Sequence, residues 1–416
     1  DLGETDDMGK HFDANNNFYY CPNEPLDISA IPLPKGTEPD NSNEITAEYT
    51  ETVARCTGND KFDAHPQAND WYETIKLNYG IDYCDWGGRS NHFNPIPDTW
   101  HKMTDILLFW AAKGIDGFRC DMAEMVPHEF WKYATEKVKA QYPHIVFIGE
   151  VYDPNQYRTY IAAGFDYLYD KVGMYDCLRD VMCEHRSAND ITRQWQATDD
   201  ISKHVLYFLE NHDEQRIASN FFCGNMQKGI PALIVAALFQ CNPIMIYAGQ
   251  EFGEKGMDGE GFSGIDGRST IFDYWSIDAI RKGFFERSKL SAEQVQLEKE
   301  YRKILTLCNS EKAISNGKTF DLMYANETND AFDSNKQFAF LRSSNNTTLL
   351  IVANFSKTEA HIRVNIPAHA FDYMEIKEGK KNMVDLLSGN HQSVVLQKDS
   401  SIEIVVPALN GRVYKF

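Results

Sequence analysis

The sequence predicts an α/β fold in which a barrel of parallel strands follows a loop-rich segment and precedes an antiparallel β-sandwich. Apolar runs and amphipathic helical patterns alternate over residues 98–285, as expected for repeated strand–helix units. After about residue 311 the helical pattern stops, and short apolar runs separated by turn residues take its place. The predicted organisation is a loop-rich insert over 1–95, a barrel segment over 96–310 and a sandwich over 311–416.

The N-terminal segment lacks helical periodicity and is rich in turn-forming residues. Three consecutive asparagines lie at 15–17, and a Pro-rich stretch follows at 31–36. Alternating apolar and polar residues over 71–79 predict one of several small strands. We therefore expect an irregular, loop-rich subdomain here.

The barrel segment begins with a helix that Asp98 can cap, followed by a strand that runs to Asp121. Pro127 opens a second helix, which ends before a strand to Glu150. The remaining predicted elements are strands over 164–170, 204–213 and 243–251 and an apolar helix over 230–240. These give about five parallel strands, whereas a closed barrel of this kind has about eight.

The C-terminal segment predicts strands and no long helix. Short apolar runs bounded by turn residues occupy 349–354, 361–366, 393–396, 402–406 and 412–416. Such spacing is typical of an antiparallel sandwich.

The composition limits the classes of partner. With 61 Asp and Glu residues against 41 Lys and Arg, the net charge is −20, which argues against a nucleic-acid partner and suits a neutral ligand. No apolar run approaches the ~18 residues of a membrane helix, so no membrane span is expected. Nine cysteines, an odd number without metal-type spacing, predict mostly free, buried thiols.

Three apolar runs each lead into an acid, at Asp121, Glu150 and Asp213. Active sites of parallel barrels lie at the C-terminal ends of the strands, so we expect these carboxylates to converge on one cleft. Converging carboxylates allow one group to stay ionised while another is held protonated, which glycosidic bond cleavage requires.

The residues around these acids resemble the α-amylase family of retaining glycosidases, glycoside hydrolase family thirteen. Segment 117–121, Gly-Phe-Arg-Cys-Asp, resembles the second family motif, segment 149–152 the third, and segment 211–213, Asn-His-Asp, the fourth. Segment 243–251 resembles the last barrel strand. The resemblance implies that Asp121 is the nucleophile and Glu150 the general acid/base, and that His212 and Asp213 bind the sugar at the cleavage subsite.

Two further residues accompany these acids. Arg119 lies two positions before Asp121 on the same strand face, where its guanidinium favours the ionised carboxylate. Tyr152 shares a face with Glu150 and could either stack on a sugar or pack in the core. The implied chemistry needs no cofactor. A structural calcium ion is possible, and Asp6, Asp7 and Asp13 either contribute to it or form a solvated acidic loop.

The sequence also departs from the family pattern. The first motif, an Asp followed four residues later by Asn-His, is absent, so we expect a (β/α)8 barrel without its first three strands. Glu124 and Met125 replace the Lys-His pair that many α-amylases carry after the nucleophile, which is closer to neopullulanase and cyclomaltodextrinase members.

The expected function is retaining cleavage of α-1,4-glucosidic bonds in starch, maltodextrin or related α-glucans. A transglycosidase acting on the same glucans and a non-catalytic glucan-binding protein remain alternatives. Relatives that degrade starch are often exported, so we expect a periplasmic or extracellular location for the full-length protein.

Overall fold

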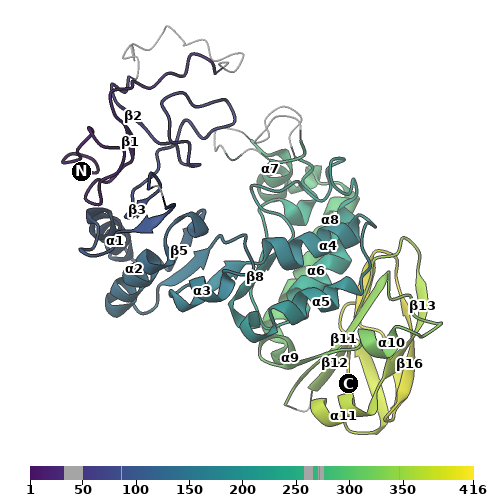
Figure 1. Ribbon diagram of the computed structural model, residues 1–416. Helices are drawn as coiled ribbons and strands as arrows, with labels where there is room; N and C mark the ends of the chain where they lie inside the picture. Colours follow the sequence, from purple (N-terminus) through teal and green to yellow (C-terminus); the bar gives the residue numbers. More distant parts are fainter. Residues whose placement is uncertain (32–49, 86, 257–265, 270, 272–275, 346) are drawn as a thin grey trace. The chain divides into compact units, whose positions relative to one another are not determined.

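The computed structural model describes residues 1–31, 50–85, 87–256, 266–269, 271, 276–345 and 347–416. The chain divides into two compact units. Unit 1 comprises residues 1–148 with 162–165, and unit 2 comprises residues 149–161 with 166–416. Figure 1 shows the chain coloured along the sequence, with many of the helices and strands labelled.

The first part of unit 1 is loop-rich, as predicted. Its strands are two residues long and form two antiparallel pairs: β1 (Tyr20–Cys21) with β2 (Ala54–Arg55), and β3 (Ile81–Asp82) with β4 (Ser90–Asn91). The strand predicted over 71–79 is not a continuous strand, because its described pairing consists of isolated bridges from Ile75 and Leu77. The alternation of apolar and polar residues predicted a strand here. The described residues pair with it only at single positions, so no ladder forms.

Strand–helix alternation follows in unit 1 as predicted. The elements are α1 (Asp98–Ala111), β5 (Gly117–Cys120), the short 3₁₀ helix η1 (Ala123–Met125), α2 (His128–Gln141) and β6 (Val146–Gly149). Aromatic side chains fill the space between α1, α2 and the strands. The Trp100 ring meets the Phe130 ring edge-on at 5.8 Å, and the Phe118 and Phe147 rings lie 5.4 Å apart.

Unit 2 contains three further parallel strands of the predicted barrel class. These are β7 (Tyr167–Tyr169), β8 (Val205–Phe208) and β9 (Ile244–Met245), in the order β7-β8-β9. The helices in this part of the chain are α3 (Tyr157–Ala162), η2 (Lys171–Tyr175), α4 (Asp176–Met182), α5 (Asp190–Ala197), η3 (Asp199–His204), η4 (Met226–Lys228), α6 (Gly229–Leu238), η5 (Gln250–Phe252), α7 (Asp278–Phe285), η6 (Arg287–Lys289) and α8 (Ala292–Ser310). The strand–helix order over β5 to β9 is therefore that of half a (β/α)8 barrel.

The C-terminal part of unit 2 is antiparallel, as predicted. A six-stranded sheet has the order β10-β11-β12-β17-β14-β15, and β13 pairs with β16. The strands are β10 (Lys318–Asp321), β11 (Gln337–Ser344), β12 (Thr347–Asn354), β13 (Ala360–Ile366), β14 (Gly379–Asp385), β15 (His391–Leu396), β16 (Ser400–Val406) and β17 (Asn410–Lys415). Three short helices, α9 (Lys312–Ser315), α10 (Met323–Asn326) and α11 (Ala368–Met374), lie among them in sequence.

Helix α6 forms the centre of unit 2. All ten of its residues are buried, because it packs against α8 and β8 and against β12 and β17 of the C-terminal sheet. A helix covered on every side carries no polar face, which explains the continuous apolar run in the sequence.

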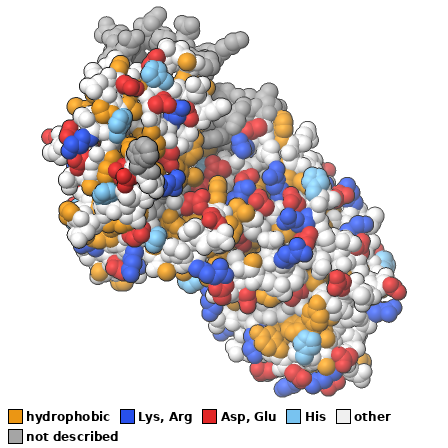
Figure 2. Space-filling view, viewed as in Figure 1, with side chains coloured by type: hydrophobic (Ala, Val, Ile, Leu, Met, Phe, Trp, Pro, Cys, Tyr) orange, Lys and Arg blue, Asp and Glu red, His pale blue; other side chains and the backbone are white. Residues whose placement is uncertain are grey.

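The distribution of charged side chains on the surface fits a composition that contains both acidic and basic residues. Figure 2 shows acidic and basic side chains interspersed over the visible face of unit 2. Among the described residues, no helix is both long enough and apolar enough to span a bilayer.

Candidate active site

The end of β5 presents an acid paired with an arginine. Asp121 directly follows the strand, and its carboxylate pairs with the guanidinium of Arg119. The Asp121 side chain is 73% exposed, so a ligand can reach it. Met122 has a left-handed backbone (φ 42°), which turns the chain into η1 immediately after the acid. The indole nitrogen of Trp131 donates to the carbonyl of Ala123 at 3.0 Å and fixes that turn.

The end of β6 presents a second, buried acid. Glu150 directly follows the strand and is 4% exposed. The Tyr152 hydroxyl donates to Glu150 Oε1 at 3.0 Å, so the two side chains share a face as predicted. Burial raises the pKa of Tyr152, and the charges of Glu150, Asp213 and Glu214 raise it further. Tyr152 therefore lies in an acidic environment, to which the segment after β8 contributes.

A polar turn after β8 holds the third acid. Asn211 Oδ1 accepts hydrogen bonds from the backbone N–H groups of Asp213 (3.0 Å) and Glu214 (2.9 Å). Nε2 of His212 lies 3.2 Å from Asp213 Oδ2, and both side chains are about one-third exposed, at 38% and 31%. The imidazole and the carboxylate are thus presented together, as two hydrogen-bonding groups on one turn.

The residues predicted from sequence fall into two groups, one in each unit. Unit 1 carries Arg119 and Asp121, and unit 2 carries Glu150, Tyr152, His212 and Asp213. Each group has the local contacts described above. The convergence of all three acids on one cleft stays a prediction.

A buried ion pair of Glu210 and Arg216 lies behind the β8 turn, and Glu210 was not predicted from the sequence. Arg216 donates to Glu210 Oε2 (2.8 Å), to the Ser269 hydroxyl (2.7 Å) and to the Ala248 carbonyl (2.9 Å). Its guanidinium carbon lies 3.9 Å from the centre of the Tyr247 ring. Burial raises the pKa of Glu210, an effect that Arg216 opposes. Glu210 and Arg216 lie on either side of residues 211–215, and the bond from Arg216 to the Ala248 carbonyl connects this turn to the segment after β9.

No sequence signal identified this pair. From the sequence, Arg216 could either orient the acids or be a surface or packing residue, because its partners Ser269 and Ala248 come from distant segments. A useful clue would have been an arginine within one turn of a strand-end acid motif in an otherwise apolar context.

A second network lies beside Asp213. Glu214 accepts from the Tyr175 hydroxyl at 3.0 Å and pairs with Lys171 at 3.1 Å. Lys171 also pairs with Asp176 at 3.0 Å. These contacts link the segment after β7 to the segment after β8.

The acidic N-terminal loop has structural partners. Asp6 accepts hydrogen bonds from the backbone N–H groups of Asn17 and Phe18 and from the Tyr20 hydroxyl. Asp13 pairs with Lys10 at 2.7 Å. These contacts organise the loop.

A different group in unit 1 has the composition of a cation site. Asp82, Asp85 and His92 each place one ligand atom within 4.8 Å of the others. Exposed groups of this kind are common without an ion. The His92 ring also contacts the Ser90 hydroxyl through Nε2 at 3.0 Å.

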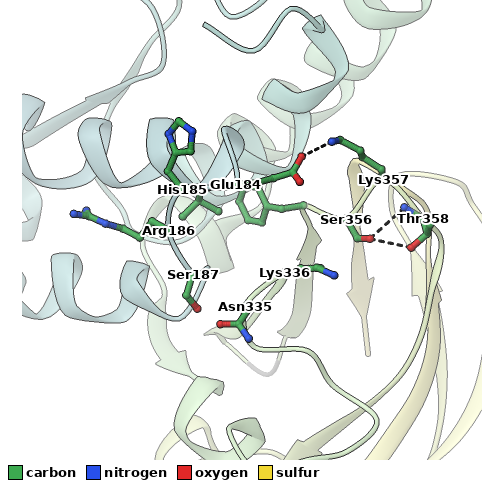
Figure 3. Close-up of a pocket in the computed structure, with 11 residues that line it drawn as sticks. Glu184, His185, Arg186, Ser187, Asn335, Lys336, Ser356, Lys357 and Thr358 are labelled. Atoms are coloured by element: carbon green, nitrogen blue, oxygen red, sulfur yellow. Dashed lines mark hydrogen bonds and ion pairs between the residues drawn. The ribbon is translucent and has the colours of Figure 1, made fainter.

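A pocket of about 610 Å³ lies in unit 2 between the segment after α4 and the ends of β11 and β12 (Figure 3). In it, the Glu184 carboxylate pairs with Lys357 at 2.5 Å. The described lining includes neither Glu150 nor Asp213. The pocket is therefore separate from the strand-end acids, whose chemistry we regard as the better guide to function.

Comparisons with known proteins identify related families and folds. The model of the α-amylase catalytic domain matches residues 95–361, and that of the α-amylase C-terminal all-beta domain matches residues 329–416. The chain is 32% identical over 92 residues to an α-1,4-glucan:maltose-1-phosphate maltosyltransferase of Cereibacter sphaeroides, covering 21% of this chain and 16% of that protein. It is 23% identical over 300 residues to a cyclomaltodextrinase of Geobacillus thermopakistaniensis, covering 70% of this chain and 44% of that protein.

Solved structures give the same fold. An α-amylase from Anoxybacillus superposes with a TM-score of 0.59 at 18% identity, covering 79% of this chain and 65% of that one. The chain spans less than half the length of both curated relatives named above.

Proposed function

The chain belongs to the α-amylase family, and we propose that it is a retaining α-glycoside hydrolase that cleaves α-1,4-glucosidic bonds in starch, maltodextrin or related α-glucans. The observation that carries the proposal is the placement of Asp121 and Glu150. Each follows directly on a strand of the half-barrel, β5 or β6, within its family motif.

The proposed mechanism is a double displacement. Asp121 attacks the anomeric carbon and forms a glycosyl ester, while Glu150 gives a proton to the leaving oxygen. Glu150 then takes a proton from water, which attacks the ester and releases the sugar with its original configuration. Arg119 supports this role, because its guanidinium pairs with the Asp121 carboxylate at the end of β5.

The other predicted residues bind the sugar in this proposal. His212 and Asp213 offer a donor and an acceptor to ring hydroxyls, and such hydrogen bonds strengthen in the transition state. The hydroxyl of Tyr152 is engaged with Glu150, which favours a role in orienting that acid over stacking. The reaction itself needs no cofactor.

A glucan transglycosidase is the second candidate. It is favoured by the similarity to a protein named as a maltosyltransferase. In both candidates the glycosyl ester on Asp121 is the same, and they differ in whether water or a sugar hydroxyl accepts the glycosyl group. Chromatography of products from maltooligosaccharides separates them, because transfer yields chains longer than the starting sugar.

Substitution of the two acids tests their roles. We expect Asp121→Asn to abolish turnover of maltodextrin. Glu150→Gln should slow maltodextrin turnover by about 10²–10⁴-fold. The same substitution should reduce the rate much less with an α-glucoside whose aryl leaving group needs no proton. The measurements are reducing-sugar release and aryl release, with ¹H NMR of the first product anomer as the test of retention.

The matched control is Asp116→Asn, an exposed acid just before β5, which should leave both rates unchanged. Equal losses on natural and activated substrates in Glu150→Gln would contradict its assignment as the acid. A β-configured first product would contradict retention.

A further inference from the structure

Two cysteines of unit 2 lie close enough to react with each other. The sulfur atoms of Cys183 and Cys223 are 3.7 Å apart, although 40 residues separate them in the sequence. Cys183 directly follows α4, and Cys223 lies in the segment between β8 and η4. All nine cysteines are free, as expected, but only four are buried. Cys183 and Cys223 are half-buried, so small reagents in solvent can reach them.

The surroundings of the pair favour one thiolate beside one thiol. The hydrogen bond from Cys223 lowers the pKa of Cys183, and His185, Lys228 and Arg179 add positive charge that lowers it further. The same hydrogen bond raises the pKa of Cys223. A thiolate is the reactive form of cysteine, and basic surroundings are typical of reactive thiols.

The segments that carry the two sulfurs are held in place. Next to Cys183, the Glu184 carboxylate pairs with Lys357 (2.5 Å) and with Lys228 (3.6 Å), the first contact being visible in Figure 3. The backbone N–H of Cys223 donates to the carbonyl of Ile217 at 3.3 Å. Both sulfurs lie on segments with local contacts, and bond formation needs the sulfurs to close from 3.7 Å to about 2.05 Å.

We propose that Cys183 and Cys223 form a thiol-oxidation site that reacts with peroxides and closes to a disulfide between α4 and the segment after β8. The Cys183 thiolate attacks one peroxide oxygen, the O–O bond breaks, and hydroxide leaves as Cys183 becomes a sulfenic acid. The Cys223 thiol then attacks the Cys183 sulfur. The S–S bond forms and water leaves, so that two thiols and one hydrogen peroxide give one disulfide and two waters.

This site is independent of the proposed glycosidase activity, because neither sulfur belongs to the acid groups described above. Its readout is the number of thiols rather than sugar release. Failure of the enzymatic proposal would leave it intact.

The test uses the whole chain, reduced with dithiothreitol, freed of reductant and treated with hydrogen peroxide. Thiols are counted with Ellman's reagent after denaturation, and linked peptides are identified by mass spectrometry without reduction. We expect the count to fall from nine to seven, with one cross-link that joins Cys183 to Cys223. In Cys223→Ser, Cys183 should instead be trapped by dimedone as a sulfenic acid.

The matched control is Cys308→Ser, which removes a half-buried thiol on α8 of the same unit. On peroxide treatment this variant should still lose two of its remaining thiols. Two outcomes would overturn the proposal. One is retention of all nine thiols at peroxide doses that oxidise free dithiothreitol, and the other is a cross-link between different cysteines.

Discussion

Asp170 is a buried acid that the proposed mechanism does not use. It directly follows β7 and is almost fully buried, and the Tyr157 hydroxyl donates to its Oδ1 at 3.3 Å. Among the described residues, Oδ2 has no hydrogen-bond partner. Burial raises the pKa of Asp170 from 3.8 to about 6, although backbone N–H groups from residues 173 and 174 oppose the shift. A strand-end acid is thus not by itself a site residue.

The raised pKa predicts a pH-dependent stability. Between pH 3.8 and about 6 the folded chain keeps a proton on Asp170 that the unfolded chain has lost. The free energy of unfolding therefore falls as pH rises through this window, by about 3 kcal/mol for this group, and is constant above it. We expect Asp170→Asn to remove this contribution in urea unfolding at pH 4 to 7. The control Asp199→Asn, at an exposed acid, should keep the wild-type slope; an unchanged slope in Asp170→Asn would contradict the prediction.

The Glu210–Arg216 pair predicts a strong mutual dependence. Both side chains are fully buried, so removal of one leaves the other as an unpaired buried charge. We expect Arg216→Met and Glu210→Gln each to lower the free energy of unfolding, Arg216→Met by about 3–5 kcal/mol. The double variant should lose clearly less unfolding free energy than the two single variants lose together, because no unpaired charge remains buried.

Chemical unfolding of the two single variants and the double variant measures this coupling. Arg193→Met is the control, since that side chain is 83% exposed and should change stability by less than about 0.5 kcal/mol. Strictly additive losses would show that the pair is not coupled.

At the scale of elements, helix α6 and strand β17 approach each other closely at Gly411. A Cβ atom there would lie 2.5 Å from the Val352 carbonyl oxygen and 2.6 Å from Ile234 Cδ1. We expect Gly411→Val to lower stability by about 1–3 kcal/mol, seen as a lower Tm, because the sheet or the helix must shift. Gly87→Ala is the control, since its Cβ would meet nothing within 4 Å. Equal Tm values for Gly411→Val and wild type would contradict the close approach.

The elements also show which sequence signals were sufficient. The apolar run of α6 predicted a buried helix correctly, because burial on all sides leaves a continuous apolar pattern. The runs that end at Asp121 and Glu150 predicted strands correctly, although β5 and β6 are only partly buried. Strands β10, β11 and β14 were missed. In β11, seven of eight residues are buried, yet Gln337 and Arg342 interrupt the apolar pattern.

The residues of the candidate site differ in how far their roles could be inferred from local sequence. Asp121, Glu150 and Asp213 could be proposed from the sequence because each belongs to a local motif at a strand end. Glu210 was not proposed, and Arg216 was left open between orienting the acids and a surface or packing role, because the contacts of Arg216 with Ser269 and Ala248 are supplied only by the folded chain.

At the scale of the molecule, Arg342 links the C-terminal sheet to the helices of unit 2. This fully buried residue of β11 donates to the Phe239 carbonyl at the end of α6 (2.7 Å) and to the Ala313 carbonyl in α9 (3.0 Å), and also to the carbonyl of Ile314. Carbonyls at helix C-termini lack intrahelical partners and carry partial negative charge, so a buried guanidinium suits them. One cation thereby satisfies carbonyls of two helices from within the sheet.

This arrangement predicts that the sheet and the helices of unit 2 unfold together. Arg342→Met keeps much of the side-chain volume but removes every donor, leaving several buried carbonyls unsatisfied, and should cost about 3–5 kcal/mol in urea unfolding. Arg342→Lys should recover only part of this loss, because one ammonium cannot reach both α6 and α9. Arg363→Met on β13, where the side chain is 51% exposed, is the control and should leave stability nearly unchanged. If Arg342→Met lowers the free energy of unfolding by less than about 1 kcal/mol, packing of α6 against β12 and β17 alone joins the helices to the C-terminal sheet.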